Sequence, residues 1–333
     1  MELILIIPLL ISLATTLLFL PKWIGKASKI GLIWENMNKY TRKPLIAGSG
    51  GITFISGFII GLLVYIAINT FYFKSSQNVI GIFGLTTAIL ILAMIGFADD
   101  LMGWRSGGLS KKLRMVLCLF AAIPLIVINS GVSQLSIPII GTVSFGILYA
   151  IIAIPIGIVA TSTTFNMLAG YNGLEAGQGI IILTALGIST YATGNPWLAF
   201  VCALAVAALI PFWFYNKYPA KVLGGDVLTY PIGGLIGIIA ILGNIEKIAV
   251  IFFIPYIIEV ILKVRGGLQK QSFGKPDKND NLSLPYTKIY GLEHFAILIL
   301  NRTKKEVREK DVVWLIHAIQ LIFVIIGLGV LAY

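Results

Sequence analysis

Apolar segments of about 20 residues recur along the whole chain and are separated by shorter polar stretches. A helix of roughly 20 apolar residues is long enough to cross the hydrocarbon core of a bilayer. The strands of a transmembrane barrel would instead alternate apolar and polar residues over about ten positions, a pattern that these segments lack. The chain is therefore predicted to be an all-α integral membrane protein with about ten spans, at 2–21, 46–70, 79–98, 112–129, 142–165, 176–192, 196–215, 226–243, 247–263 and 312–332.

Basic residues are divided unevenly between the segments that join these spans. When alternate segments are assigned to opposite sides, 23 of the 25 Lys and Arg residues fall on one side, and only Lys74 and Lys247 fall on the other. Lys and Arg are enriched in cytoplasmic loops, so this split places the basic loops in the cytoplasm and both termini outside. The net charge of +11 suits anionic lipid headgroups as well as an anionic substrate, and it does not decide the function.

The chain shows no internal repeat, low-complexity linker or detachable soluble domain, so residues 1–333 are predicted to form a single polytopic membrane domain. Its longest polar stretch is 264–311, which contains a turn-rich segment at 274–281 and an amphipathic piece at 293–300. We expect this region to be a cytoplasmic loop that caps the active site.

The few acidic residues lie at the ends of apolar segments. In a chain that is 58% hydrophobic and 12% charged, Asp99 and Asp100 close one apolar run, and Asp226 follows two glycines. A carboxylate near hydrocarbon costs roughly 2.5–3.5 kcal/mol, so its default interpretation is functional. The alternatives are structural: Asp226 as a helix cap and Asn166 as an interhelical hydrogen-bonding residue. Capping of the next helix would explain only one member of the adjacent Asp pair.

The predicted topology places Asn166 and Asp226 in loops on the same side of the membrane. Mg²⁺ typically takes one or two protein oxygens and completes its shell with water and substrate phosphates. The sequence contains no Cys/His cluster for zinc and no P-loop for ATP hydrolysis. The residues therefore favour a magnesium site that acts on phosphates.

Three segments resemble a known enzyme family. Gly96-Phe97-Ala98-Asp99-Asp100 resembles the Asp-Asp motif of polyprenyl-phosphate N-acetylhexosamine-1-phosphate transferases, and Gly225-Asp226 resembles their later metal aspartate. The segment 166–178 ends in Asn-Gly-Leu-Glu-Ala-Gly-Gln, as in the dolichyl-phosphate N-acetylglucosamine branch of that family. The resemblance spans nearly the whole chain and implies a ten-span membrane enzyme that uses magnesium.

The resemblance also implies roles for individual residues. Asn166 and Asp226 would hold Mg²⁺, with Mn²⁺ as an alternative. Asp99 would face the lipid phosphate, and Asp100 would support it. Lys112 would hold a phosphate, with the neighbouring Lys111 as an alternative.

The implied substrate contacts come from several loops. Asn172 and Glu175 would lie beside the nucleotide-sugar, and Lys43 belongs to a segment, 38–44, that resembles the border of the nucleotide pocket. Two positions depart from the family pattern. Thr163 stands where the dolichyl branch often has Asn, and 272–278 lacks a His-x-His or Arg-x-Arg pair. A phosphate clamp in this last loop would therefore come from Arg265, Lys270 or Lys275.

The implied reaction transfers N-acetylglucosamine-1-phosphate from UDP-N-acetylglucosamine to a polyprenyl phosphate such as dolichyl phosphate, and it releases UMP. It is the first step of lipid-linked oligosaccharide synthesis for N-glycosylation. Another UDP-N-acetylhexosamine or a bacterial-type polyprenyl phosphate is the alternative within this reaction class. The implied partners are these substrates and the lipid bilayer, without nucleic acid, and a homodimer is left open.

Two other classes of protein remain as alternatives. A secondary transporter of anionic solutes would show inverted repeats and ionisable groups near the midplane. A lipid-binding scaffold would leave the Asp-Asp and Asn-Gly-Leu-Glu segments unexplained. The expected location is the cell membrane, or the endoplasmic reticulum membrane in a eukaryote, with the active site facing the cytoplasm.

Overall fold

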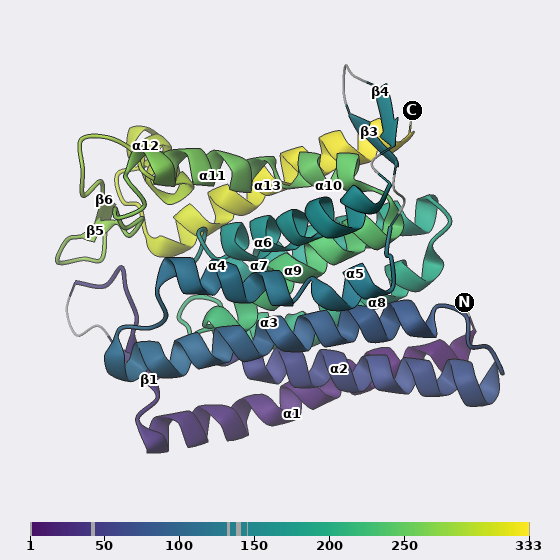
Figure 1. Cartoon of the computed structure of the whole chain (residues 1–333). Coiled ribbons are helices and arrows are strands. Elements are labelled where there is room, and N and C mark those ends of the chain that lie inside the picture. Colours follow the sequence, from purple (N-terminus) through teal and green to yellow (C-terminus); the bar gives the residue numbers. More distant parts are fainter. Residues whose placement is uncertain (1, 41–43, 132–133, 138–140, 145, 333) are drawn as a thin grey trace.

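The structure is a computed structural model of the whole chain, and it describes residues 2–40, 44–131, 134–137, 141–144 and 146–332. The helices run side by side along one direction (Figure 1). Both termini lie at the end of the bundle that carries the hairpin β3 (Gln134–Ile137) and β4 (Gly141–Ser144). The opposite end carries α12 (Leu292–Thr303) and two further hairpins, and we refer to it as the α12 end.

Six helical stretches within the described residues are long and apolar enough to cross a membrane, which supports the predicted helical membrane protein. They are Leu3–Ile30 (η1, Leu3–Leu5, with α1, Ile6–Ile30), Gly51–Tyr72 (α2, Gly51–Ala67, with η2, Ile68–Tyr72), Val79–Trp104 in α3 (Val79–Ser106), α8 (Pro196–Asn216), α9 (Asp226–Gly243) and α13 (Glu309–Ala332).

The other four predicted spans coincide with three shorter or interrupted helical segments and with α7, which is long enough but less apolar. They are α4 (Lys111–Phe120) with α5 (Ile123–Val127), η3 (Tyr149–Ala153) with α6 (Ile154–Phe165), α7 (Leu174–Ala192), and α10 (Glu246–Phe252) with α11 (Ile254–Arg265). Pro124 and Pro255 stand in the first turns of α5 and α11. Proline lacks the N–H that a continuing helix needs, so each pair is broken just before it.

Three short antiparallel hairpins were not predicted from the hydrophobic pattern. Besides β3–β4, they are β1 (Ile33–Glu35) with β2 (Leu45–Ala47), and β5 (Lys275–Pro276) with β6 (Leu282–Ser283). The span expected at 142–165 therefore begins later, since β4 occupies its first residues. Strands of two to four residues give too few alternating positions to stand out in a sequence.

Helix α9 is the core of the bundle. In its apolar stretch 89% of the residues are buried, against 22% for Leu3–Ile30 and 28% for α13. Glycines on α9 allow this burial. A Cβ on Gly233 would overlap the backbone of Thr161 in α6, and one on Gly234 would overlap Leu92 in α3. Small residues let membrane helices approach closely, since the hydrophobic effect does not drive their association within lipid.

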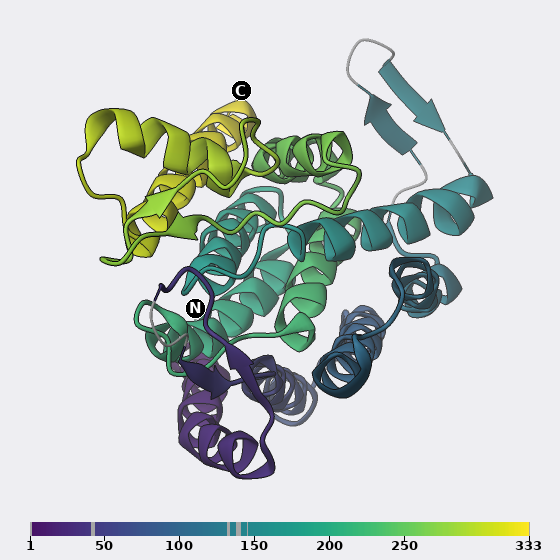
Figure 2. The ribbon, with the colours of Figure 1, turned by 90° about the vertical axis from the view of Figure 1, so that its left-hand side faces the viewer.

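The view from the α12 end shows the helices nearly end-on, with the C-terminal elements on the side opposite α1 and α2 (Figure 2).

At the α12 end of the bundle, α11 and α12 enclose a buried charge cluster. Glu259 accepts a hydrogen bond from the backbone N–H of Leu292, at 2.6 Å, and lies 3.4 Å from the Lys263 ammonium. Lys263 also donates to the hydroxyl of Ser272. Glu293 is fully buried and lies near both Ser272 and Glu259.

Burial, with the nearby Glu259 carboxylate as a second cause, raises the pKa of Glu293 well above its ordinary value. The native state therefore holds a proton that the unfolded chain releases above its own pKa of roughly 4.3. The stability contributed by Glu293 is then complete below that pH and is lost as the pH rises toward the native pKa.

We expect Glu293→Gln to raise the apparent Tm by roughly 2 °C or more at pH 7.5, because a neutral amide avoids this cost. The gain should be smaller at pH 5, because this pH is close to the pKa of Glu293 in the unfolded chain and the cost of protonation on folding is then small. Thermal unfolding of the detergent-solubilised protein at both values measures it, and Glu306→Gln, at an exposed carboxylate, is the matched control. A lower Tm for Glu293→Gln at both values would contradict the prediction.

Candidate active site

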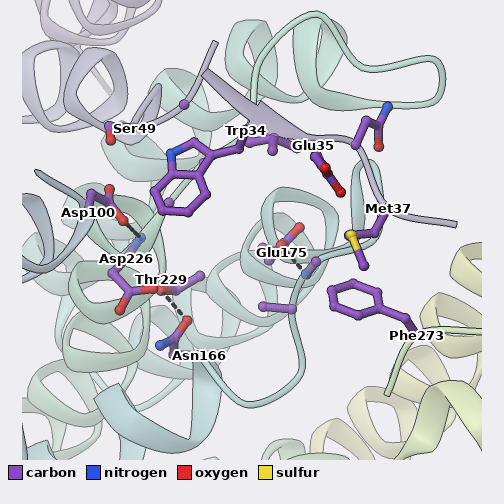
Figure 3. A pocket seen from close by; sticks show the side chains of 17 residues that line it. Trp34, Glu35, Met37, Ser49, Asp100, Asn166, Glu175, Asp226, Thr229 and Phe273 are labelled. Carbon is purple, nitrogen blue, oxygen red and sulfur yellow. Dashed lines mark hydrogen bonds between the residues drawn. The ribbon is translucent and has the colours of Figure 1, made fainter. Parts of the chain in front are cut away.

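A cavity of about 530 Å³ opens at the α12 end of the bundle. Its walls come from segments far apart in the sequence, and their side chains converge on one space (Figure 3). The labelled lining residues are Trp34, Glu35, Met37, Ser49, Asp100, Asn166, Glu175, Asp226, Thr229 and Phe273. This volume lies within the range of roughly 300–1,000 Å³ that small-molecule sites occupy.

Asp100 connects α3 to the beginning of α9. Its carboxylate accepts hydrogen bonds from the backbone N–H groups of Asp226, at 2.8 Å, and Val227, at 3.4 Å. The first N–H groups of a helix lack partners within the helix and form its positive end, so a carboxylate is favoured there. Gly225 has a φ of 74°, and a Cβ on it would overlap the Asp100 carboxylate. Asp100 is thus a cap, but for α9 and not for the next helix in the sequence.

Asp99 is buried, at 6% exposure, and is not among the described residues that line the cavity. Its Oδ1 accepts from the backbone N–H of Leu109, at 2.5 Å, and its Oδ2 accepts from Nη1 of Arg114, at 2.9 Å. The same Nη1 lies 3.3 Å from Oδ2 of Asp226. Arg114 therefore bridges the carboxylate of Asp99 and that of Asp226, which lines the cavity.

Arg114 is the basic residue that sequence reasoning missed. Lys112, the predicted phosphate contact, is exposed in the first turn of α4 and is not among the described residues that line the cavity. Lys111, its alternative, donates to the backbone oxygen of Leu268. The available signal was helical spacing: Arg114 lies four residues before Cys118, the buried residue of α4, and so shares its inward face.

The two predicted metal ligands, Asn166 and Asp226, line the same cavity. The Asn166 Oδ1 accepts a hydrogen bond of 2.9 Å from Oγ1 of Thr229, which lies three residues after Asp226 on α9 and hence on the same face. Amide and carboxylate oxygens are suitable ligands for Mg²⁺, so the donor set fits that ion. Within the described part of the chain, no group of three or more His, Cys, Asp or Glu side chains is arranged to hold a metal. The remaining ligands would be substrate phosphates and water.

Glu175, predicted to lie beside the nucleotide-sugar, also lines the cavity. Its Oε1 accepts a hydrogen bond of 2.6 Å from the backbone N–H of Gly170, and this closes the loop between α6 and α7 on itself. Gly170 has a φ of 101°, a conformation that side chains other than glycine rarely adopt. Glu175 therefore shapes the cavity wall as well as facing the cavity.

Asn172 is placed behind that wall, among the residues of a second, smaller cavity. Its backbone N–H donates a 2.7 Å hydrogen bond to Oε1 of Glu309 at the start of α13. Glu309 forms a buried ion pair with Lys39, which follows β1. The loop that carries Asn166 and Asn172 is thus tied to both ends of the chain.

The remaining predicted contacts lie away from the cavity or outside the described residues. Lys43 falls among the residues that the structure does not describe. Arg265 and Lys275 are exposed and are not among the described lining residues. Phe273, two residues before Lys275, does line the cavity. Its ring stacks on that of Tyr171, and the two ring centroids are 6.2 Å apart.

Residues 82–244 match the family described as glycosyl transferase family 4. A Saccharolobus solfataricus protein is 38% identical over 324 residues, which cover 97% of this chain and 95% of that protein. A Sulfolobus acidocaldarius protein is 33% identical over 92% of this chain and 90% of that protein. Both are provisionally named UDP-N-acetylglucosamine–dolichyl-phosphate N-acetylglucosaminephosphotransferase.

A Dictyostelium discoideum protein carries the same name, and there the name is not provisional. It is 31% identical over 211 residues, which cover 54% of this chain and 50% of that protein. These matches confirm the resemblance found in the Asp-Asp and Asn-Gly-Leu-Glu segments, and the chain belongs to the same family as these proteins named N-acetylglucosaminephosphotransferases, in agreement with its match to glycosyl transferase family 4.

Proposed function

We propose that the protein transfers N-acetylglucosamine-1-phosphate from UDP-N-acetylglucosamine to a dolichyl-type polyprenyl phosphate and releases UMP. The observation that carries this proposal is one cavity that brings together Asn166, Asp226, Asp100 and Glu175, in a chain whose near full-length relatives bear the name of this activity. A transporter of anionic solutes is not favoured, since those relatives are named as transferases.

The lipid phosphate is the nucleophile in this reaction. One of its oxygens forms a bond to the β-phosphorus of UDP-N-acetylglucosamine, while the bond from that phosphorus to the α–β bridging oxygen breaks. UMP leaves with the electron pair of the broken bond. The sugar C1–O bond stays intact, so the anomeric configuration is retained. A phosphomonoester has a second pKa of about 6, so the nucleophile is mostly dianionic at neutral pH and needs no strong base.

The residues of the cavity act by binding and charge compensation. Asn166 and Asp226 would hold Mg²⁺, or Mn²⁺ as the alternative, and the bound ion would supply Lewis-acid stabilisation of the diphosphate charge. Arg114 compensates Asp99 and Asp226, which keeps the Asp226 carboxylate oriented at the cavity. Asp100 fixes the start of α9, and Glu175 fixes the opposite wall.

We also propose that the α12 end faces the cytoplasm and that ten spans cross the membrane. The 23-to-2 division of Lys and Arg supports this orientation. An even number of spans agrees with both termini lying at the end opposite α12 (Figure 1). The placement of Phe273 in the cavity wall supports a capping role for residues 264–311.

Asp226→Asn and Asn166→Ala should each lower transfer by roughly a hundredfold or more without unfolding the protein, because each removes an oxygen donor from the proposed metal site. The measurement is release of UMP and formation of lipid-linked sugar from radiolabelled UDP-N-acetylglucosamine, dolichyl phosphate and Mg²⁺. Glu306→Gln, at an exposed carboxylate, is the control. Wild-type turnover by both variants would exclude this metal site, and no transfer by the unmodified protein would exclude the proposed function.

Asp99→Asn should lower the rate by roughly tenfold to a hundredfold, and the deficit should not change between pH 6 and pH 8.5. The reason is geometric: both Asp99 oxygens are engaged, by Leu109 and Arg114, so Asp99 positions Arg114 and does not remove a proton from the substrate. Rate–pH profiles of variant and wild type measure this. A deficit that disappears at high pH would instead support proton removal by Asp99.

Single cysteines should report the proposed orientation. Lys112→Cys and Lys275→Cys should react with an impermeant thiol reagent only in inside-out vesicles, whereas Lys74→Cys and Lys247→Cys should react only in intact cells. The native Cys118 and Cys202 are buried, so background labelling should be low. Labelling at residue 112 in intact cells would refute the orientation.

A further inference from the structure

A second cavity, of about 250 Å³, lies between the last turn of α8, the loop before α7 and the first turns of α13. Its chemistry is basic and aromatic, and its described lining residues include no carboxylate. The residues that matter here are Asn172, Trp213, Lys217, Tyr218, Lys310 and Trp314. The mechanism proposed above uses none of their side chains.

The position of this cavity relates it to the membrane boundary. The candidate span α8 ends at Asn216, one residue before Lys217, and the candidate span α13 begins at Glu309, one residue before Lys310. Both lysines are exposed, and the two span ends next to them in the sequence lie at the α12 end of the bundle. Lysines at span ends commonly extend toward lipid headgroups.

Aromatic rings on the outer surface strengthen this assignment. Trp314 is 63% exposed and Phe214 is 57% exposed, although both are large apolar side chains. The Lys217 ammonium lies 4.6 Å from the ring centroid of Phe214 and 5.0 Å from that of Trp213. Tryptophan rings next to lysines are typical of the interface between hydrocarbon and headgroups, where one end of the side chain is apolar and the other is wet.

Asn172 is a buried polar residue in the wall of the same cavity. The residue is 2% exposed, and neither the nitrogen nor the oxygen of its side-chain amide has a hydrogen-bond partner among the described residues. A buried polar group without a partner is costly, so such groups in native proteins call for an explanation. A polar ligand beside Lys217 and Lys310 would provide one.

We propose that this second cavity binds the phosphate group of an anionic membrane phospholipid that is not a substrate of the enzyme. The two lysines would pair with the phosphate, and the exposed rings of Trp314 and Phe214 would lie along the acyl chains. The bound headgroup would contact the loop that carries both Asn172 and Asn166, and it would therefore brace the wall shared with the active site. This inference goes beyond the proposed function and does not depend on it.

The test is lipid retention by the full-length protein, without an activity measurement. Delipidated protein in detergent is titrated with phosphatidylglycerol or phosphatidylcholine, and bound lipid is counted by native mass spectrometry. Wild type should retain phosphatidylglycerol preferentially. Lys217→Gln with Lys310→Gln should weaken that retention by roughly tenfold to thirtyfold, as expected for two lysines near an anionic headgroup.

The matched control is Lys22→Gln with Lys26→Gln, which removes two exposed lysines near the same end of another candidate span, α1. This control should retain phosphatidylglycerol like wild type. Equal retention by the Lys217/Lys310 variant and wild type would overturn the proposal. The single variant Lys310→Glu changes one exposed residue and should also weaken retention, so a failure of the double variant to fold does not remove the test.

A competition experiment distinguishes a lipid phosphate from free inorganic phosphate as the ligand. Inorganic phosphate at millimolar concentration should not displace phosphatidylglycerol, because it lacks the acyl chains that the aromatic rings would contact. Displacement by inorganic phosphate alone would indicate a site for soluble anions and would overturn the lipid assignment.

Discussion

The contact between the Asp100 carboxylate and the first N–H groups of α9 holds the active-site end together. Near hydrocarbon, a carboxylate without partners would be expensive, but here two backbone donors and the positive end of a buried helix compensate for its charge. The contact also fixes the rotation of α9. Asp226, its first residue, then faces the cavity, and Thr229, on the same face, holds the amide oxygen of Asn166 beside it. Gly96 and Gly225 permit this approach, since a Cβ on either would overlap the partner segment.

Charge balance at the same place explains why a divalent cation suits this site. Asp99, Asp100 and Asp226 are three acidic groups, and Arg114 is the one cation in ion-pair contact with them among the described residues. A diphosphate that enters the cavity would add further negative charge to a poorly solvated space. Like charges at this separation repel strongly unless a cation is shared between them. The excess of negative charge supports the magnesium proposal independently of the ligand types, because Arg114 is already shared between two carboxylates.

The sequence predicted what local pattern and motif determine, and it failed where distant segments meet. Apolar runs of full length identified the helices that became α1, α2, α3, α8, α9 and α13. The motifs located Asp100, Asn166, Glu175 and Asp226, all of which line one cavity. Lys112 was predicted, with Lys111 as its alternative, and Arg114 was not considered, because the spacing after an Asp pair does not say which basic residue faces inward. The capping of α9 by Asp100 and the pairing of Lys39 with Glu309 join residues 126 and 270 positions apart, which periodicity cannot reveal.

The loop between α6 and α7 has a different neighbour on each of its sides. Gly170 and Glu175 belong to the wall of the active-site cavity, whereas Asn172 belongs to the wall of the second cavity. The backbone of Asn172 is held by Glu309, and the start of α7 is held by the hydrogen bond from Gly173 to Asn216, at 3.1 Å. A short loop anchored in this way can move little as a whole. Occupancy of the second cavity would therefore change how firmly the Asn166 side of the loop is held, rather than where it lies.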